Sequence, residues 1–523
     1  MNKVLDYSET KEKLSLREKV GQLFMPAAFI NDSEEEILRL EKLIRDHGVG
    51  GLCFFHSRAS AATNYEGKAK VIYNEYSFET LKNLIQRYQS ISKYPLLIAI
   101  DAEWGLAMRI ENTPQYPYAL TLGAIQNDNT IIFEVGKNIA KDCKAAGIHW
   151  NLAPVVDINN NPNNPVIGYR SFGEDRDVVT EKAMAFVKGT QSEGVLTSIK
   201  HFPGHGDTAT DSHLGLPLIK KSKQELIENE LYPFQKLIDE GVDSVMVGHL
   251  SIPALANGKD TPSSISKDII KGVLRKEMGF NGVVISDALN MHAVSKNYPE
   301  KGKLEWLAFD AGNDVLCFAE HTSEGIETIL KNASTDQIEE NFERVWKLKL
   351  KAQISDTNAN LKLEKSTSLN QKLALASITL YQGTKAAIST LISKEFIGLT
   401  NIKPIDDKFF KTINLTKKFT LLQLEEKSFA SDKNILMALV PPQVKPIDNF
   451  GFTDAEIKGI NQLIKNNNVM LYLFGNPYFL NCIDISNAKA VVVCYQNFEV
   501  FQEVAAAHFL GNHEARGKLP IRL

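Results

Sequence analysis

The sequence predicts an α/β protein in which a (β/α)8 TIM barrel precedes a second, smaller α/β domain. Eight short apolar runs alternate with amphipathic segments over the first 350 residues, and this repeated alternation is the sequence signature of such a barrel. A polar stretch rich in Ser, Thr and Asn then separates them from a second set of alternating runs. We therefore expect a barrel domain over residues 1–352, a linker over 353–370 and a C-terminal domain over 371–523.

The barrel strands are predicted where the chain is almost continuously apolar, which is typical of parallel strands buried on both faces. These runs are Gln22–Ala27, Gly50–Phe55, Leu96–Asp101, Ile148–Pro154, Val195–Lys200, Ser244–His249, Gly282–Asp287 and Asp314–Phe318. Amphipathic spacing predicts helices between them, for example at Glu34–Asp46, Glu79–Ser92, Asp177–Glu193 and Lys223–Glu240.

The second domain is expected to hold an open, parallel sheet of roughly five strands. Its strand-like runs are Ser377–Tyr381, Phe396–Leu399, Ile435–Val440, Val469–Phe474 and Ala490–Tyr495, with a final helix at Glu499–Leu510. No GxGxxG or P-loop motif occurs, so nothing in the sequence supports nucleotide binding.

Composition and charge exclude several classes of protein. Hydrophobic residues make up 43 % and charged residues 23 % of the 523 residues, which excludes disordered, collagen-like and coiled-coil chains. The 59 basic and 63 acidic residues give a net charge of −4, so we expect no nucleic-acid partner.

The N-terminus is charged and no apolar run approaches the ~20 residues of a membrane span. We therefore expect a cytoplasmic protein. The five cysteines are scattered, which predicts neither a disulfide framework nor a structural zinc site.

Polar and ionisable residues follow several of the predicted barrel strands, at the end where barrel enzymes place their chemistry. They are Asp101 and Glu103, Asn151 and Asp157, Lys200 and His201, His249, and Ser286 and Asp287. Their number predicts a functional site at the mouth of the barrel.

The segment Lys200–His213, after the fifth strand, holds three histidines and two aspartates. Pro and Gly residues within it rule out a helix and predict a shaped loop. Asp211 and His213 are two residues apart and can bring a carboxylate against an imidazole, which orients the ring and raises its pKa. Such a pair serves as a general acid/base, although it can also simply hold a loop together.

A metal site is the second alternative for this loop. Its histidines and aspartates could supply metal ligands. Barrel metallohydrolases of the amidohydrolase type open with His-x-His on the first strand, whereas Gln22–Ala27 contains no histidine. We therefore expect neither a metal nor another cofactor.

Asp287 ends an apolar strand and is expected to point into the mouth of the barrel. It could act as a nucleophile toward an electrophilic carbon or cap a following helix; a proton-donating loop across the barrel favours the nucleophile. Carboxylate, guanidinium and ammonium groups at Asp101, Arg109, Arg170 and Lys200 suit the hydroxyl groups of a sugar. Trp104 could stack on the sugar or belong to the core.

These motifs resemble glycoside hydrolase family 3, and within it the β-N-acetylglucosaminidase (NagZ-like) branch. The resemblance rests on Lys200-His-Phe-Pro-Gly-His-Gly-Asp-Thr-x-x-Asp-Ser-His213 and on Ser286-Asp287-Ala-Leu, and it extends from Leu16–Gln22 to the end of the chain. It implies that the second domain is an α/β sandwich with a mostly parallel sheet. The roles it implies are Asp287 as nucleophile, His213 with Asp211 as acid/base dyad, and Asp101, Arg109, Arg170, Lys200 and His201 as residues that hold the sugar.

The resemblance implies retaining hydrolysis of terminal, non-reducing β-linked N-acetylglucosamine in cell-wall muropeptides or chitin-type oligosaccharides, so the expected partner is a small carbohydrate. A phosphorylase or a β-glucosidase of the same family, a metal-dependent barrel hydrolase and a non-catalytic sugar-binding module are the alternatives. One departure concerns specificity: the family pattern Glu-Gly-Gly is Glu103-Trp104-Gly105 in this chain, and the indole is expected to alter the wall of the site.

Overall fold

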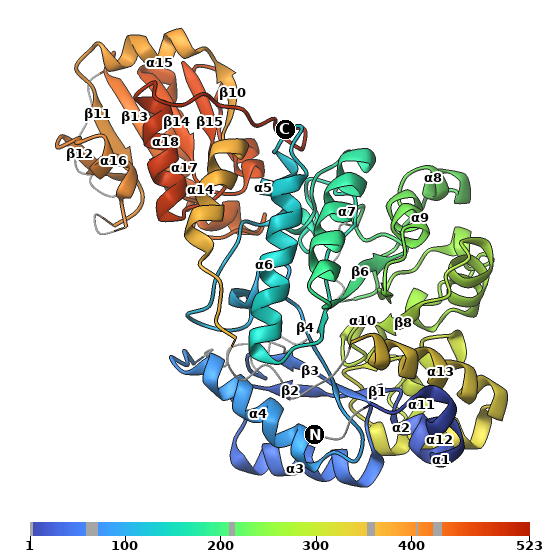
Figure 1. Cartoon of the computed structure of the whole chain (residues 1–523). Coiled ribbons are helices and arrows are strands. Elements are labelled where there is room, and N and C mark those ends of the chain that lie inside the picture. The colour runs from blue at the N-terminus through green and yellow to red at the C-terminus, as the bar shows by residue number, and fades with distance from the viewer. Residues whose placement is uncertain (1–3, 59–71, 209–214, 353–360, 404–405, 422–430) are drawn as a thin grey trace. The chain divides into compact units, whose positions relative to one another are not determined.

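The computed structural model describes residues 4–58, 72–208, 215–352, 361–403, 406–421 and 431–523 (Figure 1). The chain forms two compact units. The first comprises Met1–Tyr116, Phe133–Ile158 and Val179–Glu364, and the second comprises Pro117–Ile132, Asn159–Val178 and Lys365–Leu523. The second unit thus includes two segments from the N-terminal part of the sequence. The domain limits expected at residues 352 and 371 stay a prediction.

The first unit contains a closed ring of parallel strands, and the predicted fold class is confirmed. One seven-stranded parallel sheet runs in the order β2 Ala27–Phe29, β3 Gly51–Phe55, β4 Leu97–Ile100, β5 Trp150–Asn151, β6 Leu196–Phe202, β7 Ser244–Val247 and β8 Val283–Ser286. The ring closes through β9 Leu316–Cys317, which pairs with β1 Phe24–Met25, while Ile285 of β8 bridges to Val315.

The first strand position is split because Pro26 separates β1 from β2, and proline has no N–H to donate to a neighbouring strand. Counting β1 and β2 as one, the ring has eight strand positions in chain order, and each agrees with a predicted apolar run. The strands β3, β4, β6, β7 and β8 are buried along their whole length, as strands covered on both faces must be.

Helices follow the strands in the first unit. They are α1 Tyr7–Lys13, α2 Leu16–Gly21, α3 Glu34–His47, α4 Ser77–Ile91, α6 Thr130–Ala146, α7 Arg176–Ser192, α8 Lys223–Glu228, α9 Leu231–Asp239, α10 His292–Ser295, α11 Lys303–Ala311, α12 Thr322–Asn332 and α13 Thr335–Lys351, with a π-helix, η5, at Asp268–Glu277. Helix α3 shows why they begin and end where they do. Ser33 and Glu36 form a capping box, and Gly48 ends the helix with φ +59°. No helix in the described part of the chain is long and apolar enough to cross a membrane.

The single helix predicted at Lys223–Glu240 is wrong. The structure has α8 and α9, which are separated at Asn229 and Glu230. Pro233 lies in the first turn of α9, where its missing N–H costs nothing. In one continuous helix Pro233 would remove the hydrogen bond to the carbonyl of Asn229 and its ring would clash with that carbonyl.

The second unit is built on a six-stranded sheet in the order β10 Thr379–Gly383, β15 Ala490–Val493, β14 Asn468–Leu473, β13 Asn434–Leu439, β11 Ile397–Thr400 and β12 Lys418–Thr420. The expectation of a mostly parallel sheet is confirmed: among the described strands β10, at one edge, is antiparallel to its neighbour β15, and the other pairs are parallel. The sequence missed β12, a three-residue edge strand that is only partly buried and therefore lacks an apolar run.

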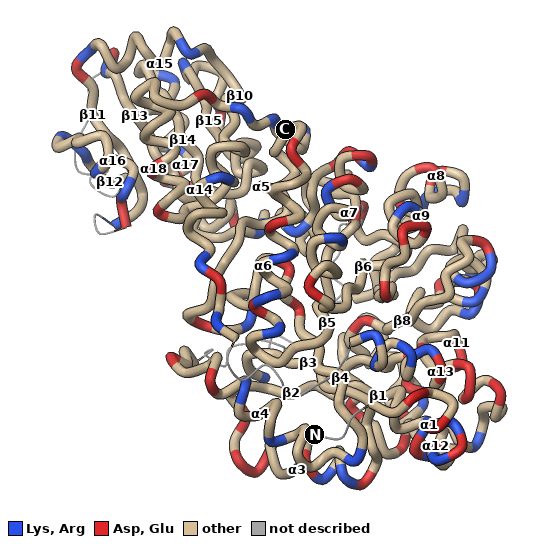
Figure 2. Tube along the Cα trace, in the orientation of Figure 1, with Lys and Arg blue, Asp and Glu red and all other residues tan. Residues whose placement is uncertain are grey.

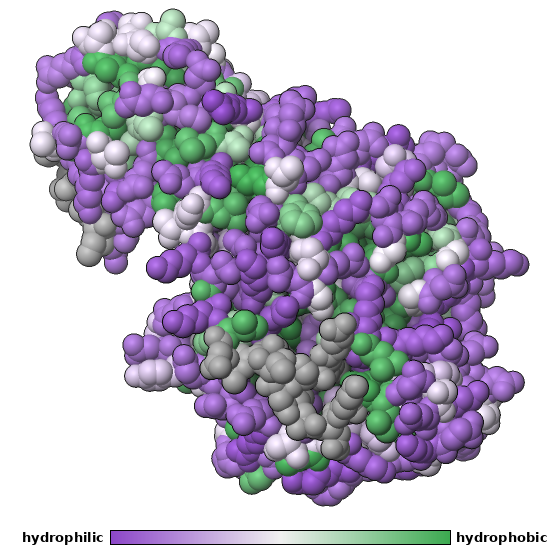
Figure 3. All heavy atoms as spheres, viewed as in Figure 1, coloured by the Kyte–Doolittle hydropathy of each residue, from purple (hydrophilic) through white to green (hydrophobic). Residues whose placement is uncertain are grey.

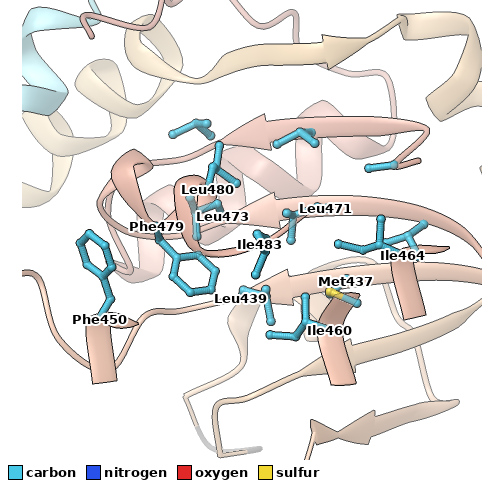
Figure 4. Close-up of a cluster of buried hydrophobic side chains, with 14 of the residues drawn as sticks. Met437, Leu439, Phe450, Ile460, Ile464, Leu471, Leu473, Phe479, Leu480 and Ile483 are labelled. Atoms are coloured by element: carbon cyan, nitrogen blue, oxygen red, sulfur yellow. The ribbon is translucent and has the colours of Figure 1, made fainter. Parts of the chain in front are cut away.

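The helices of the second unit are α5 Ala119–Gly123, α14 Ser366–Ser377, α15 Lys385–Ile392, α16 Lys408–Thr412, α17 Asp454–Asn466 and α18 Glu499–Phe509. Helix α14 occupies the last part of the segment expected to be a linker, 353–370, whose residues 353–360 lie outside the described residues. The core of the unit gathers side chains from β13, β14 and α17 around Phe479 (Figure 4). Leu120 and Ala124 of the segment Pro117–Ile132 belong to the same core.

The surfaces of both units are polar. Acidic and basic residues are interspersed along the chain (Figure 2), in line with the nearly balanced charge, and hydrophilic residues predominate on the face shown in Figure 3. No single-sign region of the kind that tracks a phosphate backbone is visible on the described chain.

The buried carboxyl group of Asp142, on α6, predicts a pH-dependent stability. It accepts hydrogen bonds from the Glu364 N–H at 2.7 Å and the Tyr116 hydroxyl at 3.4 Å, and burial raises its pKa to about 7. Because the folded pKa exceeds the unfolded one, the stabilisation is complete below pH ~4 and is lost as the pH rises through about 7.

We therefore expect Asp142→Asn to raise the free energy of unfolding at pH 8, by on the order of 2 kcal/mol, and to change it much less at pH 5. Asparagine keeps an oxygen that accepts from the Glu364 N–H but carries no charge. Thermal unfolding at the two pH values measures the effect, with Asp239→Asn at the exposed end of α9 as control. Equal shifts at both pH values would contradict this account.

Candidate active site

Two strand ends of the barrel bring together a network of charged side chains. Lys200, in β6, is 2 % exposed, and its Nζ lies 2.7 Å from Asp101 Oδ1 and 2.8 Å from Glu103 Oε1. Arg109 Nη2 lies 2.9 Å from Asp101 Oδ2. Burial opposes the ionisation of Asp101, but the charges of Lys200 and Arg109 outweigh it and lower its pKa to about 2. Asp101 is therefore ionised at neutral pH, and the network offers donors and acceptors side by side.

The short segment after β4 carries three of these residues because its backbone turns sharply. Gly105 has φ +100°, and a Cβ at this position would lie 2.7 Å from the Pro114 carbonyl oxygen. The turn brings Arg109 back onto the carboxylate of Asp101. The sequence analysis named Glu103 among the strand-end residues but gave it no role in the site.

A second pair consists of His201 and Asp157. The carboxylate of Asp157 is fully buried and lies 2.7 Å from His201 Nδ1. It also accepts the backbone N–H groups of His201 at 3.1 Å and His205 at 2.7 Å. Burial raises the pKa of Asp157, but the charges of His201 and His205 and these hydrogen bonds outweigh it and lower the pKa. An ionised carboxylate only accepts, so His201 Nδ1 carries a proton and its ring orientation is fixed.

Asp287 lies directly after β8 and is partly exposed. Its N–H donates to the Val247 carbonyl at 2.9 Å, and its Oδ1 accepts the Ala288 N–H at 2.8 Å. The alternative that Asp287 caps a helix is not supported, because α10 begins at His292 with Met291 as N-cap. The position of the carboxylate is therefore set by the strand and not by a helix.

One buried thiol links Asp287 to the charged network. A hydrogen bond with Cys53 of β3 and burial raise the pKa of the Cys317 thiol on β9, and the charges of Asp101 and Asp287 raise it further. Asp101 follows β4 and Asp287 follows β8, which are parallel strands of the same ring, so both residues come after carboxyl ends of barrel strands. The two carboxylates therefore lie near the same end of the barrel interior, on strand positions three and seven.

A family model described as "Glycosyl hydrolase family 3 N terminal domain" matches residues 15–348. The chain belongs to glycoside hydrolase family 3. The resemblance predicted from the motifs is thereby confirmed.

Two relatives and one solved structure that are similar to this chain are named as hexosaminidases or N-acetylglucosaminidases. Beta-hexosaminidase A of Pseudoalteromonas piscicida is 33 % identical over 378 residues, which are 65 % of this chain and 60 % of that protein. A beta-hexosaminidase of Tolumonas auensis is 33 % identical over 290 residues, 54 % of this chain and 78 % of that protein. The structure of a family 3 beta-N-acetylglucosaminidase from Paenibacillus sp. str. FPU-7 aligns with a TM-score of 0.78 at 26 % identity and covers 98 % of this chain and 99 % of that one.

For three predicted site residues the structure gives no position relative to this network. Asp211 and His213 fall in residues 209–214, outside the described residues. Arg170 belongs to the second unit, where it ends the 3-10 helix η2, Gly168–Arg170, and its N–H donates to the Ile167 carbonyl at 2.6 Å. Trp104 is partly exposed. The grouped residues Asp101, Arg109, Lys200 and His201 do lie at barrel strand ends.

Sequence reasoning missed a buried pair next to Arg109. His56 follows β3, and its Nε2 lies 2.5 Å from Glu111 Oε1. The Arg109 guanidinium stacks 5.3 Å from the centre of the Phe55 ring. No short motif marks His56 and Glu111, because they are 55 residues apart and follow two strands, β3 and β4, that pair only in the folded sheet. In the described ranges no three His, Cys, Asp or Glu side chains are grouped as a metal site requires.

Proposed function

We propose that this chain is a retaining exo-β-N-acetylglucosaminidase that hydrolyses terminal, non-reducing β-linked N-acetylglucosamine from cell-wall muropeptides or chitin-type oligosaccharides. The observation that carries the proposal is that Asp287 and the Asp101–Lys200–Arg109 network both occupy carboxyl ends of parallel strands in a family 3 barrel. The names of the relatives, beta-hexosaminidase and beta-N-acetylglucosaminidase, support the acetamido sugar.

In the first step a carboxylate oxygen of Asp287 attacks the anomeric carbon, and the bond from that carbon to the leaving oxygen breaks. His213, protonated and held by Asp211, gives its proton to the leaving oxygen. A covalent glycosyl ester with Asp287 results. In the second step His213 takes a proton from water, the water oxygen forms the new bond to the anomeric carbon, and the carboxylate of Asp287 leaves. Two inversions give net retention.

The charged network is proposed to hold the sugar during both steps. Lys200 and Arg109 would donate to hydroxyl oxygens, and Asp101 would accept from hydroxyl groups, with His201 as a further contact. Because Lys200 and Arg109 are already paired with Asp101, these groups need little reorganisation when the sugar binds. Such preorganisation lowers the entropic cost of the reaction.

A panel of aryl β-glycosides that differ only at the 2-position tests the proposal. We expect acetamido substrates to be cleaved far faster than those with a free hydroxyl, and NMR of the first product to show the β-anomer. Preference for the hydroxyl would indicate a β-glucosidase instead. A phosphorylated product in phosphate buffer would indicate a phosphorylase, and loss of activity with EDTA a metal-dependent hydrolase.

Asp157→Asn tests the orientation of His201. The amide that replaces the carboxylate is uncharged, so the hydrogen bond from His201 Nδ1–H no longer ends on a carboxylate. Hydrogen bonds to charged groups contribute ~1.5–3 kcal/mol. We therefore expect kcat/KM on an aryl β-N-acetylglucosaminide to fall by ~10–100-fold, mainly through KM. A melting curve separates this loss from unfolding, and an unchanged KM in a folded variant would contradict the role.

A further inference from the structure

His249 lies two residues beyond the end of β7 and has no part in the mechanism proposed above. Its side chain is fully buried, and both nitrogens of its ring have partners. Nδ1 lies 2.7 Å from Ser264 Oγ, and Nε2 lies 2.9 Å from the carbonyl oxygen of Ala288. A buried histidine with two partners is an ordinary part of a protein core, but one of these partners directly follows Asp287 in the chain. The ring therefore contacts the segment that carries the proposed nucleophile.

The two partners determine which nitrogen of His249 carries the proton. A carbonyl oxygen can only accept, so Nε2 is protonated and donates a hydrogen bond to Ala288. In the neutral ring Nδ1 then accepts from the hydroxyl of Ser264. Ser264 is itself buried, and its carbonyl accepts the side-chain amide of Asn313 at 2.8 Å. Ser264 thus holds the ring in the tautomer that donates to Ala288.

The hydrogen bond from His249 holds the chain beyond the paired part of the strands. The N–H of Asp287 donates to the Val247 carbonyl at 2.9 Å, and the N–H of Leu289 donates to a carbonyl of β9 at 3.0 Å. Between them, the N–H of Ala288 donates to Asp287 Oδ1 at 2.8 Å, while the carbonyl of Ala288 accepts from His249. Because its carbonyl is held, the backbone of Ala288 is restrained, and its N–H keeps its direction toward the carboxylate of Asp287.

We propose that His249 is a positioning residue for Asp287: it fixes the Ala288 carbonyl and, through the Ala288 N–H, the orientation of the Asp287 carboxylate. The inference rests on the proposed function, in which Asp287 attacks the anomeric carbon. Attack requires the reacting atoms to lie ~3–3.5 Å apart and in line, and a misplacement of ~1 Å can cost ~100-fold in rate. His249 acts through the backbone of Ala288 and exchanges no proton with the substrate.

The test measures pre-steady-state release of the phenol from 2,4-dinitrophenyl β-N-acetylglucosaminide by the full chain. This leaving group needs no proton, so the rate reports attack by Asp287. In His249→Phe, whose ring fills similar space but donates no hydrogen bond, we expect the rate at saturating substrate to fall by ~10–100-fold and the dissociation constant of the substrate to change much less. We expect His249→Gln to restore most of the rate, because the Nε2 amide of glutamine can donate to the Ala288 carbonyl.

His149→Phe is the matched control. His149 is also a buried histidine of the barrel, but it lies at the opposite end of the strands, directly before β5, where its Nδ1 accepts the Ile98 N–H at 3.0 Å. This variant should lower the melting temperature and leave the rate unchanged. If His249→Phe does not fold, Ser264→Ala takes its place, because without the hydroxyl the ring can adopt the tautomer in which Nε2 cannot donate. Its rate should fall several-fold.

The outcomes separate the positioning role from the proposed function. Equal losses of rate in His249→Phe and His249→Gln would mean that the ring only fills space, and would overturn the positioning role. An unchanged rate in a folded His249→Phe, or in Ser264→Ala where it takes that place, would also overturn it and leave the proposed function standing. A wild type that releases no phenol overturns the proposed function and the role of His249 with it. If the wild type prefers the 2-hydroxyl substrate, the acetamido specificity fails, and a rate loss in His249→Phe on that substrate still supports the positioning of Asp287.

Discussion

Asp287→Ala is expected to reduce turnover of an aryl β-N-acetylglucosaminide by at least ~10⁴-fold, the scale of loss when a covalent nucleophile is removed. Alanine has no group that can form the glycosyl ester, so the first step has no nucleophile. Substrate binding should change much less, because the Asp101–Lys200 ion pair lies on other strands. The measurement is kcat and KM for the purified variant, with Asp239→Ala as a matched aspartate control on an exposed helix end.

Azide, added as an external nucleophile, tests whether the lost activity is due to the missing carboxylate of Asp287. In the small cavity left by alanine, azide can attack the anomeric carbon directly and produce an α-glycosyl azide with a single inversion. We expect azide to restore turnover of the aryl substrate in Asp287→Ala and to have no such effect in the wild type. Full activity without azide would remove Asp287 as nucleophile, and a β-configured azide product would mean that another residue forms the covalent intermediate.

His213→Ala is the second prediction with a large expected effect, and its size depends on the leaving group. General acid catalysis is worth ~10²–10⁴-fold. We expect a loss in that range for chitotriose, whose leaving oxygen needs a proton. For a 2,4-dinitrophenyl glycoside, whose leaving group departs as a stable anion, formation of the glycosyl-enzyme should slow far less. Pre-steady-state release of the phenol measures this step alone.

Asp211→Asn separates the two members of the proposed dyad. Removing the carboxylate should lower the pKa of His213. In the pH profile of kcat for chitotriose, the basic limb should therefore move to lower pH, and activity at acidic pH should rise relative to activity at neutral pH. Asp207→Asn, in the same loop, is the matched control; Asp207 pairs with Lys221 at 2.8 Å. Equal losses on both substrates in His213→Ala, with an unmoved pH profile in Asp211→Asn, would argue against this dyad.

Local sequence patterns were sufficient to predict the barrel strands. Runs such as Gly50–Phe55 and Gly282–Asp287 are apolar because both faces of each strand are covered, and that requirement is visible residue by residue. The break between α8 and α9 was also readable in principle, because Pro233 cannot sit inside a helix. The antiparallel direction of the edge strand β10 could not be predicted, because the direction of a strand depends on how the chain connects it to its neighbours and not on its composition.

The candidate site was predicted only in part for the same reason. Asp101, Lys200 and Asp287 could be found because each ends an apolar run and carries a charge. The pairings between side chains could not: Asp157 was noted near another strand end, but it lies 44 residues from its partner His201, and Glu111 lies 55 residues from His56. Nothing in a short window distinguishes a buried ion-pair partner from a solvated surface carboxylate.

The sequence by itself determined the order and burial of the strands, the family, and the residue types available at each strand end, because these depend on local periodicity and motif spacing. The tertiary structure alone decided that Lys200 joins Asp101 with Glu103, and that Asp157 pairs with His201. The physical reason is ring closure: parallel strands distant in the chain end at one edge of the barrel, and the contacts made there depend on packing across the whole ring.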